Sequence, residues 1–139
     1  MERYYQPEIE TASQEQIRAW QDERLVKQVK HVWDNVPYYR KKMEEKGLTS
    51  DDIKGVDDLH KLPFVTKADL REAYPLGLMT EPEEKIVRIH SSSGTTGTPV
   101  IIPYTQQDVD DWAFMFKRCY EMAGITNMDR IQITPGTSG

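Results

Sequence analysis

Long hydrophobic runs, paired cysteines and an excess of basic residues are all missing from this sequence of 139 residues. Because Cys119 is the single cysteine, the chain forms no internal disulfide, which fits a reducing compartment. No stretch approaches the roughly 18 apolar residues of a membrane span. The first five residues, Met1-Glu2-Arg3-Tyr4-Tyr5, contain no apolar signal-peptide core. We therefore expect a cytoplasmic protein with no membrane partner.

Positive charge is also scarce, since the formal net charge is -5. This balance argues against nucleic acid as a partner, because phosphate backbones are bound by basic surfaces. A nucleotide can still be bound locally by backbone N–H groups. The three histidines, His31, His60 and His90, lack the spacing of metal ligands, so no metal site is predicted in the chain. We expect His31 and His60 at the surface.

Helical spacing dominates residues 1–80. Ser13 and Gln16 form a predicted capping box at the start of a long apolar-periodic helix. Pro37 ends that helix and can open the next one. Three further signals mark helix boundaries in the rest of this region. Gly47 ends a helix, Ser50 caps a short turn, and Thr66 with Asp69 forms a second capping box.

A β-hairpin is predicted from residue 85 onward. Lys85–His90 is rich in β-branched residues, eight small residues follow at Ser91–Thr98, and Pro99–Tyr104 reads as a second strand. Its prolines, Pro99 and Pro103, fit strand ends better than a strand interior.

A third capping box, Thr105 with Asp108, opens a helix that Gly124 terminates. We expect its apolar face and Cys119 to pack in the core. The members of that face are Val109, Trp112, Ala113, Phe116, Tyr120 and Ala123. Residues 130–134 alternate like a further strand.

The predicted fold class is α/β, with an α+β arrangement within these residues. Residues 1–80 are mainly helical, and residues 85–139 supply the hairpin, a helix and the start of a strand. A strand after a crossover helix is usually followed by more sheet. Residues 1–139 are therefore interpreted as the opening part of one larger domain.

The segment Ser91–Thr98 is the candidate for chemistry. Glycines let the backbone turn tightly, successive N–H groups can form an anion-binding nest, and hydroxyls add donors. A Walker loop is excluded, because it needs a Lys after the second glycine and a helix directly behind it. On composition alone, a flexible surface turn is the more common explanation of such a Ser/Thr/Gly cluster.

The segment and its surroundings resemble the phenylacetate-CoA ligase family of adenylate-forming enzymes. The match to the phosphate signature is Ser92-Ser93-Gly94-Thr95-Thr96-Gly97-Thr98-Pro99. The other landmarks follow in order and are Val36-Pro37-Tyr38-Tyr39-Arg40, Leu62-Pro63-Phe64-Val65-Thr66-Lys67-Ala68-Asp69-Leu70-Arg71, Tyr74-Pro75-Leu76-Gly77, and Tyr104-Thr105 with Asp108. Together they cover most of residues 32–108.

This resemblance implies an acid–thiol ligase. A carboxylate attacks the α-phosphate of ATP to give an acyl-adenylate and pyrophosphate, and coenzyme A then displaces AMP to give a thioester. ATP with Mg²⁺, coenzyme A and a small carboxylic acid are the implied cofactors and partners, with a homodimer as the assembly to test. The implied ATP-binding residues are Ser92, Ser93, Gly94, Thr95, Thr96, Gly97 and Thr98, and the resemblance places no catalytic acid, base or metal ligand in this chain.

Two departures from the family pattern limit the implication. Many members carry a Lys in or just after the loop, where Thr98 and Val100 stand here. The family's acid pocket, ribose-binding acid and C-terminal lysine lie beyond the part that this chain matches, so we expect the chain alone to be inactive. The alternatives are a synthetase adenylylating another acid or a deazaflavin coenzyme, and a truncated non-catalytic binding or oligomerisation module.

Two smaller features accompany the loop. His90 adjoins it and is equally explained as a phosphate contact or as a residue that ends the strand. The basic run at residues 40–42 is expected to be a solvated helix face rather than a contact for a CoA phosphate.

Overall fold

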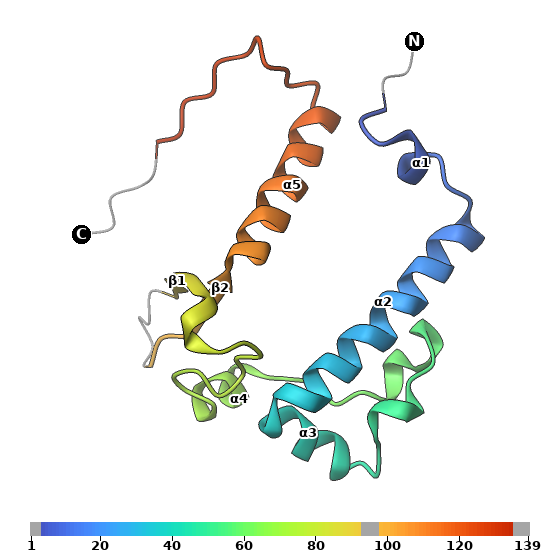
Figure 1. The fold of residues 1–139 in the computed structure, drawn as a ribbon, viewed down its shortest axis with the longest axis vertical. Coiled ribbons are helices and arrows are strands. Elements are labelled where there is room, and N and C mark those ends of the chain that lie inside the picture. Colours follow the sequence, from blue (N-terminus) through green and yellow to red (C-terminus); the bar gives the residue numbers. More distant parts are fainter. Residues whose placement is uncertain (1–3, 93–97, 135–139) are drawn as a thin grey trace.

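The computed structural model describes residues 4–92 and 98–134. Two long helices, α2 and α5, lie on opposite sides of the molecule and are joined by short helices and a two-stranded sheet (Figure 1). This mixture confirms the predicted class. The helices are α1 (Pro7–Glu10), α2 (Gln14–Asn35), α3 (Pro37–Glu44), η1 (Ser50–Asp52), η2 (Val56–Lys61), α4 (Lys67–Glu72), η3 (Glu83–Lys85) and α5 (Gln106–Met122), and the strands are β1 (Ile86–Ser91) and β2 (Ile101–Thr105).

Local capping signals begin and end most of the helices. The Ser13 hydroxyl accepts a hydrogen bond from the Gln16 N–H at 3.1 Å and so caps α2. Pro37 is the first residue of α3. Gly47 and Gly124 have φ values of 70° and 80°, the left-handed conformation that favours glycine after a helix. These predicted boundaries are confirmed.

The cap of the short turn η1 is Thr49, and the prediction of Ser50 is wrong. The Asp52 carboxylate accepts hydrogen bonds from the Thr49 N–H at 2.7 Å and from its hydroxyl at 2.8 Å. Ser50 instead lies inside the turn. Thr49 is the cap because an N-cap residue has an extended backbone and its partner carboxylate lies three residues later, which Asp52 satisfies for Thr49.

The described core is small and lies where α2 packs against α3 and η1. Val29, Met43 and Ile53 are its buried members. Partly buried side chains surround them, namely Leu25, Trp33, Tyr39, Leu48 and Leu62. These residues come from the first 62 positions, so the helical half of the chain has its own hydrophobic centre.

Gly55 permits the close approach of the η2 segment to α2. A Cβ atom at this position would lie 2.6 Å from Asp22 Oδ1. The same oxygen accepts the Val56 N–H at 2.7 Å. Any side chain at residue 55 would therefore displace the carboxylate that anchors the next residue to the long helix.

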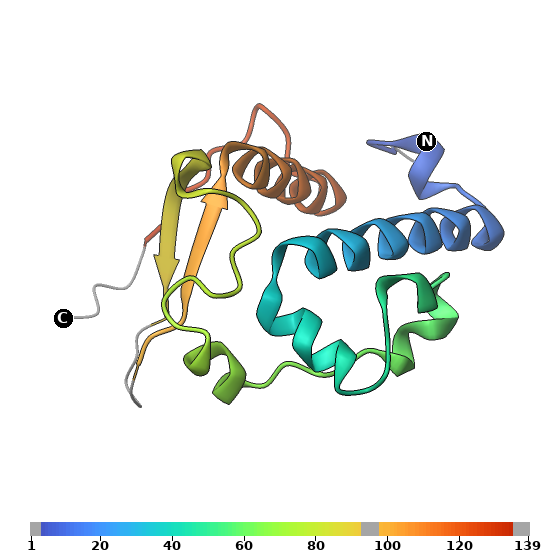
Figure 2. The ribbon, with the colours of Figure 1, turned by 60° about the horizontal axis from the view of Figure 1, so that its bottom comes forward.

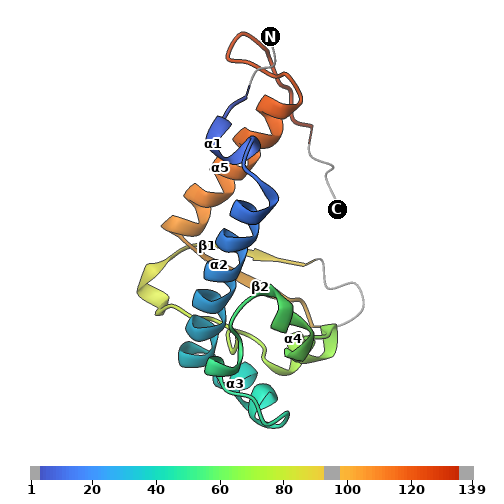
Figure 3. The same cartoon turned by 90° about the vertical axis from the view of Figure 1, so that its right-hand side faces the viewer.

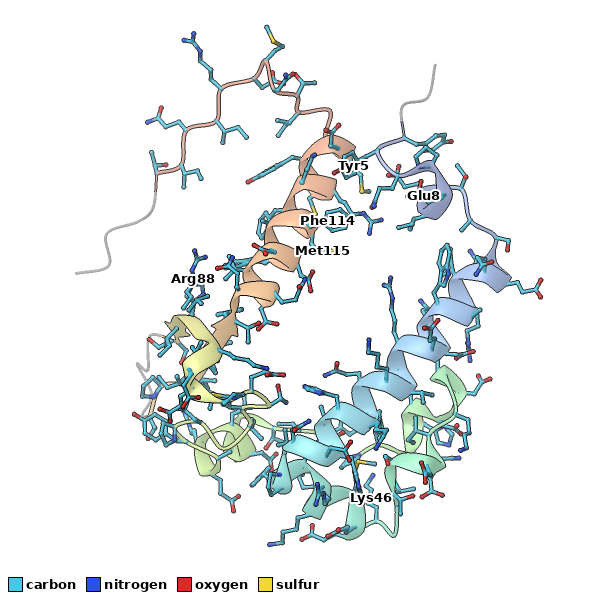
Figure 4. All side chains as sticks on the ribbon, in the orientation of Figure 1. Tyr5, Glu8, Lys46, Arg88, Phe114 and Met115 are labelled. Carbon is cyan, nitrogen blue, oxygen red and sulfur yellow. The ribbon has the colours of Figure 1, made fainter. Side chains whose placement is uncertain are left out.

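The amino-terminal segment reaches across to α5. Tyr5 and Phe114 lie with ring centroids 6.4 Å apart, and Lys117 Nζ lies 4.8 Å from the Tyr5 centroid. Figure 3 shows the amino-terminal segment at the same end of the molecule as the last turns of α5, and Figure 4 shows Tyr5 close to that helix. These contacts join the amino-terminal segment to α5.

The predicted core face of α5 is largely exposed in this structure. Trp112 is 39 % exposed and Phe116 is 46 % exposed. Tyr120 and Cys119 are also exposed. The expectation that these residues are core is therefore wrong for this chain, because the packing of α5 on β2 and its contact with Tyr5 leave most of that face uncovered.

Residues 130–134 form no strand, so that prediction is also wrong. Ile131 and Ile133 are exposed, and residues 131–134 have no assigned secondary structure. A strand exists only when a neighbour pairs with its backbone groups, and no described segment lies alongside this one. Across the described ranges, no helix is long and apolar enough to cross a membrane.

Candidate phosphate-binding site

The sheet presents the candidate loop at one of its ends. β1 and β2 pair antiparallel, with Ile89 opposite Pro103 and Ser91 opposite Ile101 (Figure 2). The predicted hairpin is thus confirmed. The second strand does run through Pro103, contrary to expectation. A proline fits there because an outer strand has one edge on which a missing N–H breaks no ladder bond.

Two hydrogen bonds close the neck of the loop. The Ser92 N–H donates to the Val100 carbonyl at 3.0 Å, and the Val100 N–H donates to Ser92 Oγ at 2.9 Å. The Ser92 side chain therefore joins the two ends of the loop, and its oxygen already has a backbone partner. Thr98 is exposed. The other proposed ligands lie outside the described residues, and they are Ser93, Gly94, Thr95, Thr96 and Gly97.

The helix that follows β2 begins at the opposite end of the strand from the loop. The Thr105 hydroxyl and N–H both donate to the Asp108 carboxylate at 2.8 Å, and the Asp108 N–H donates back at 3.2 Å. The capping box predicted from the sequence is confirmed. Because α5 does not start behind the loop, the arrangement excludes a Walker-type site, in which a helix N-terminus faces the phosphates.

An aromatic cluster joins the sheet to α5. His90 lies 4.9 Å from Tyr104 and 5.4 Å from Trp112, measured between ring centroids, and both contacts are edge-on. Tyr104 and Trp112 are stacked, with an interplanar angle of 11°. Sequence reasoning missed this cluster, although the spacing of Tyr104 and Trp112 across a helix start was a usable signal.

A hollow of about 480 Å³ lies beside β2, bounded by α4 and the segment that follows it. Its walls are mainly apolar and include Leu70, Ala73, Leu76, Met79, Ile101 and Pro103. Leu70 lies in α4, and Ala73 directly follows this helix. The position of α4 therefore shapes the space beside the strand that leads out of the loop.

Asp69 holds α4 against α3. Its carboxylate accepts a hydrogen bond from the Tyr38 hydroxyl at 2.8 Å and forms an ion pair with Lys42. The Thr66 N–H and hydroxyl donate to the same carboxylate at 2.6 Å. Two landmarks far apart in the sequence are thus bound to each other through one buried acid. Lys42, followed by Thr66 and Tyr38, holds the pKa of the Asp69 carboxyl well below its usual range.

We expect this cluster to make the fold sensitive to acid. A carboxyl whose folded pKa is depressed contributes its full stability above its unfolded pKa of about 4, and loses it as the pH falls further. The free energy of unfolding, measured by urea titration from pH 7 to pH 3, should therefore fall with pH more steeply in the parent chain than in Asp69→Asn. Asp51→Asn, at an exposed site, is the matched control and should keep the parent slope. Equal slopes for the parent and Asp69→Asn would contradict the assignment.

The basic run at residues 40–42 is only partly solvated, so the expected solvated face is wrong for two of its three members. Arg40 donates to the carbonyls of Trp33 at 2.6 Å and Asp34 at 2.9 Å, which caps the end of α2. Lys42 pairs with Asp69, and Lys41 is exposed.

The two histidines expected at the surface differ in their exposure. His60 is exposed as expected, whereas His31 is half-buried. Within residues 4–92 and 98–134, no group of three or more His, Cys, Asp or Glu side chains is placed to hold a metal ion.

Comparison with known proteins supplies the decisive observation. The chain is 46 % identical over 128 residues to the phenylacetate-coenzyme A ligase of Aromatoleum evansii, and 44 % identical over 128 residues to that of Escherichia coli K12. Both alignments cover 92 % of this chain. Over nearly all of its length, this chain is homologous to phenylacetate-CoA ligases. It spans 29 % of the length of these curated relatives.

The fold of this chain is similar to part of solved acyl-CoA ligases. An open conformation of 2-hydroxyisobutyryl-CoA ligase with 2-HIB-AMP and CoA matches 86 % of this chain with a TM-score of 0.79 at 28 % identity. The same ligase in its thioesterification state matches 81 % with a TM-score of 0.75 at 30 % identity. This chain covers 28 % and 25 % of those two chains. No protein-family model matches the sequence.

Proposed function

We propose that this chain is the amino-terminal part of the large ATP-binding domain of a phenylacetate-CoA ligase. The identity of 46 % to the Aromatoleum evansii enzyme is the observation that carries the proposal. The hairpin supports it, because β1 and β2 present a Ser/Thr/Gly segment at the end of a sheet rather than before a helix. The complete protein forms an acyl-adenylate from a carboxylic acid and ATP, and then a CoA thioester.

The loop holds the β- and γ-phosphates of ATP in this proposal. Ser93, Thr95 and Thr96 donate hydroxyl hydrogen bonds, and Gly94 and Gly97 let the backbone come close to the phosphates. Hydrogen bonds to charged oxygens are the stronger class, so several of them replace part of what a lysine supplies in other family members. Catalysis at such a site consists of positioning and charge stabilisation, for which no acid or base is needed in the loop.

Ser92 and Thr98 flank this core and have different roles. Ser92 closes the neck through its contact with Val100, and its hydroxyl hydrogen can still donate. Thr98 is exposed and is the last of the proposed ATP ligands along the chain. We propose that Mg²⁺ arrives as the ATP complex, since this ion is commonly held by substrate phosphates and water with few protein ligands.

The test is ATP–pyrophosphate exchange by the complete gene product. We expect exchange that depends on an aryl acetic acid, with phenylacetate far better than acetate, and CoA thioester formation when CoA is added. Residues 1–139 alone should show neither activity. Exchange that is absent with every carboxylic acid offered, in a folded protein, would reject the proposal. Exchange with a different acid would keep the chemistry and replace the substrate. A cytoplasmic enzyme of aromatic acid breakdown is the corresponding cellular role.

The exposed face of α5 favours one alternative, a binding or oligomerisation module. Apolar residues lie around this helix, and a helix that is apolar on several sides is normally covered. Phe114, Met115 and Met122 are exposed there together with Trp112 and Phe116. A homodimer of residues 1–139 would bury this surface, and size-exclusion chromatography distinguishes it. A soluble monomer contradicts the module, and a stable dimer without exchange activity supports it.

A further inference from the structure

His90 is the last-but-one residue of β1 and is half-buried, unlike Arg88, Ile89 and Ser91 around it. It stands opposite Ile102 in the sheet. Ser92, two residues further on, makes the hydrogen bonds that close the loop. The backbone between His90 and the loop is therefore too short to move independently of the His90 side chain.

The His90 ring is held on two sides by other elements. Tyr104, from β2, lies 4.9 Å away, and Trp112, from the first turns of α5, lies 5.4 Å away between centroids. Edge-to-face contacts of this kind prefer a narrow range of orientations. Because Tyr104 and Trp112 also stack on each other, the three rings connect both strands of the hairpin to the long helix.

Arg88 provides a comparison for His90 within the same strand. It lies on the same face of β1 as His90, two residues earlier, and is exposed. Figure 4 shows it extending from the strand alongside α5. None of the described aromatic contacts involves it. The sheet is thus fixed to α5 near the loop by His90, and its other end is joined to the helix through the Thr105 chain connection.

We propose that His90 is a positioning residue for ATP. Through the aromatic cluster it holds in place the carboxyl end of β1 and the Ser92–Val100 hydrogen bonds that close the loop. This inference rests on the proposed ATP-binding function of the loop. In this role the packing of the imidazole ring positions the loop, and the ring nitrogens are not required. A direct contact between His90 and a phosphate is the competing role, and it depends on a nitrogen donor.

Phenylalanine and alanine at position 90 separate these roles in the complete enzyme. In ATP–pyrophosphate exchange, His90→Ala should raise KM for ATP by about 10-fold to 100-fold, the scale on which small misplacements act. KM for the carboxylic acid should stay within about twofold, since the loop is the part affected. His90→Phe keeps an edge-on ring and should restore most of the ATP affinity. Arg88→Ala is the matched control and should leave both KM values unchanged.

A second variant covers the case in which His90→Ala unfolds the enzyme. Trp112→Leu removes the ring on the α5 side and should raise KM for ATP in the same way. The pair His90→Phe with Trp112→Leu should then be no worse than Trp112→Leu alone, because residues that act through one contact are not additive.

Three results overturn the inference, and each is distinct from failure of the proposed function. His90→Phe as impaired as His90→Ala assigns the role to a ring nitrogen. An unchanged KM for ATP in His90→Ala removes the role altogether. Equal rises in KM for ATP and for the acid indicate a general structural defect. If the parent enzyme itself shows no exchange, the proposed function fails before the variants are compared.

Discussion

Replacing Thr95 and Thr96 together by alanine is expected to lower ATP–pyrophosphate exchange by the complete enzyme by about 10²-fold or more. A hydrogen bond to a charged group contributes about 1.5–3 kcal/mol, and about 1.4 kcal/mol corresponds to a factor of ten in rate. Two such bonds to phosphate oxygens account for the estimate. The loss should fall on kcat/KM for ATP, while the affinity for the acid changes little.

The same double variant should leave stability almost unchanged, which separates binding from folding. Thermal unfolding of Thr95→Ala with Thr96→Ala should match that of the parent enzyme. Ser91→Ala, at an exposed strand end beside the loop, is the matched control and should retain exchange. Unchanged exchange in the double variant would remove these two threonines from the ATP site, even if the enzyme is a ligase.

Met43→Ala is expected to have the largest effect on the stability of the chain. Met43 is 0 % exposed and packs with Val29 and Ile53 in the core of the helical first half of the chain. Truncating a buried methionine to alanine costs about 2–5 kcal/mol, the sum of lost burial and a cavity. Since domains are stable by only about 5–15 kcal/mol and this core is small, urea unfolding of residues 1–139 should shift to much lower denaturant.

Met122→Ala is the matched control, because this methionine is 77 % exposed. Its free energy of unfolding should stay within about 0.5 kcal/mol of the parent, as for most surface substitutions. If both methionine variants lose equal stability in residues 1–139, the exposed face of α5 is covered in solution, and the dimer discussed above becomes the better account.

The parts of the fold that sequence reasoning predicted depend on neighbours along the chain. The boxes at Thr66 and Thr105 were found because a cap and its acid stand three residues apart. The hairpin was found from two β-branched runs around small residues, and the stops at Gly47 and Gly124 from their place after helices. Each of these signals needs only a few consecutive residues.

The failures concern burial and pairing between distant segments. Residues 130–134 have the alternation of a strand, but a strand requires a neighbour that the described chain does not place there. Trp112 and Phe116 have the spacing of a core face, but the structure leaves them exposed. Periodicity says which side chains share a face, and it does not say what covers that face.

The loop illustrates how much each level contributed. Its composition favoured a flexible surface turn. The ordered landmarks favoured the phosphate site instead, which remains a proposal for residues 93–97. The structure added the neck between Ser92 and Val100, which gives Ser92 a closing role. It also added His90, whose two ring partners come from separate elements.

The sequence by itself determined where most of the helices begin and end, where the hairpin lies, and which family the landmarks resemble. These properties follow from short-range sterics and from hydrogen bonds between residues three or four positions apart. Only the tertiary structure decided that Asp69 binds Tyr38 and Lys42, and that His90 packs on Trp112. Such contacts join residues distant in sequence, so they exist only once packing has brought whole elements together.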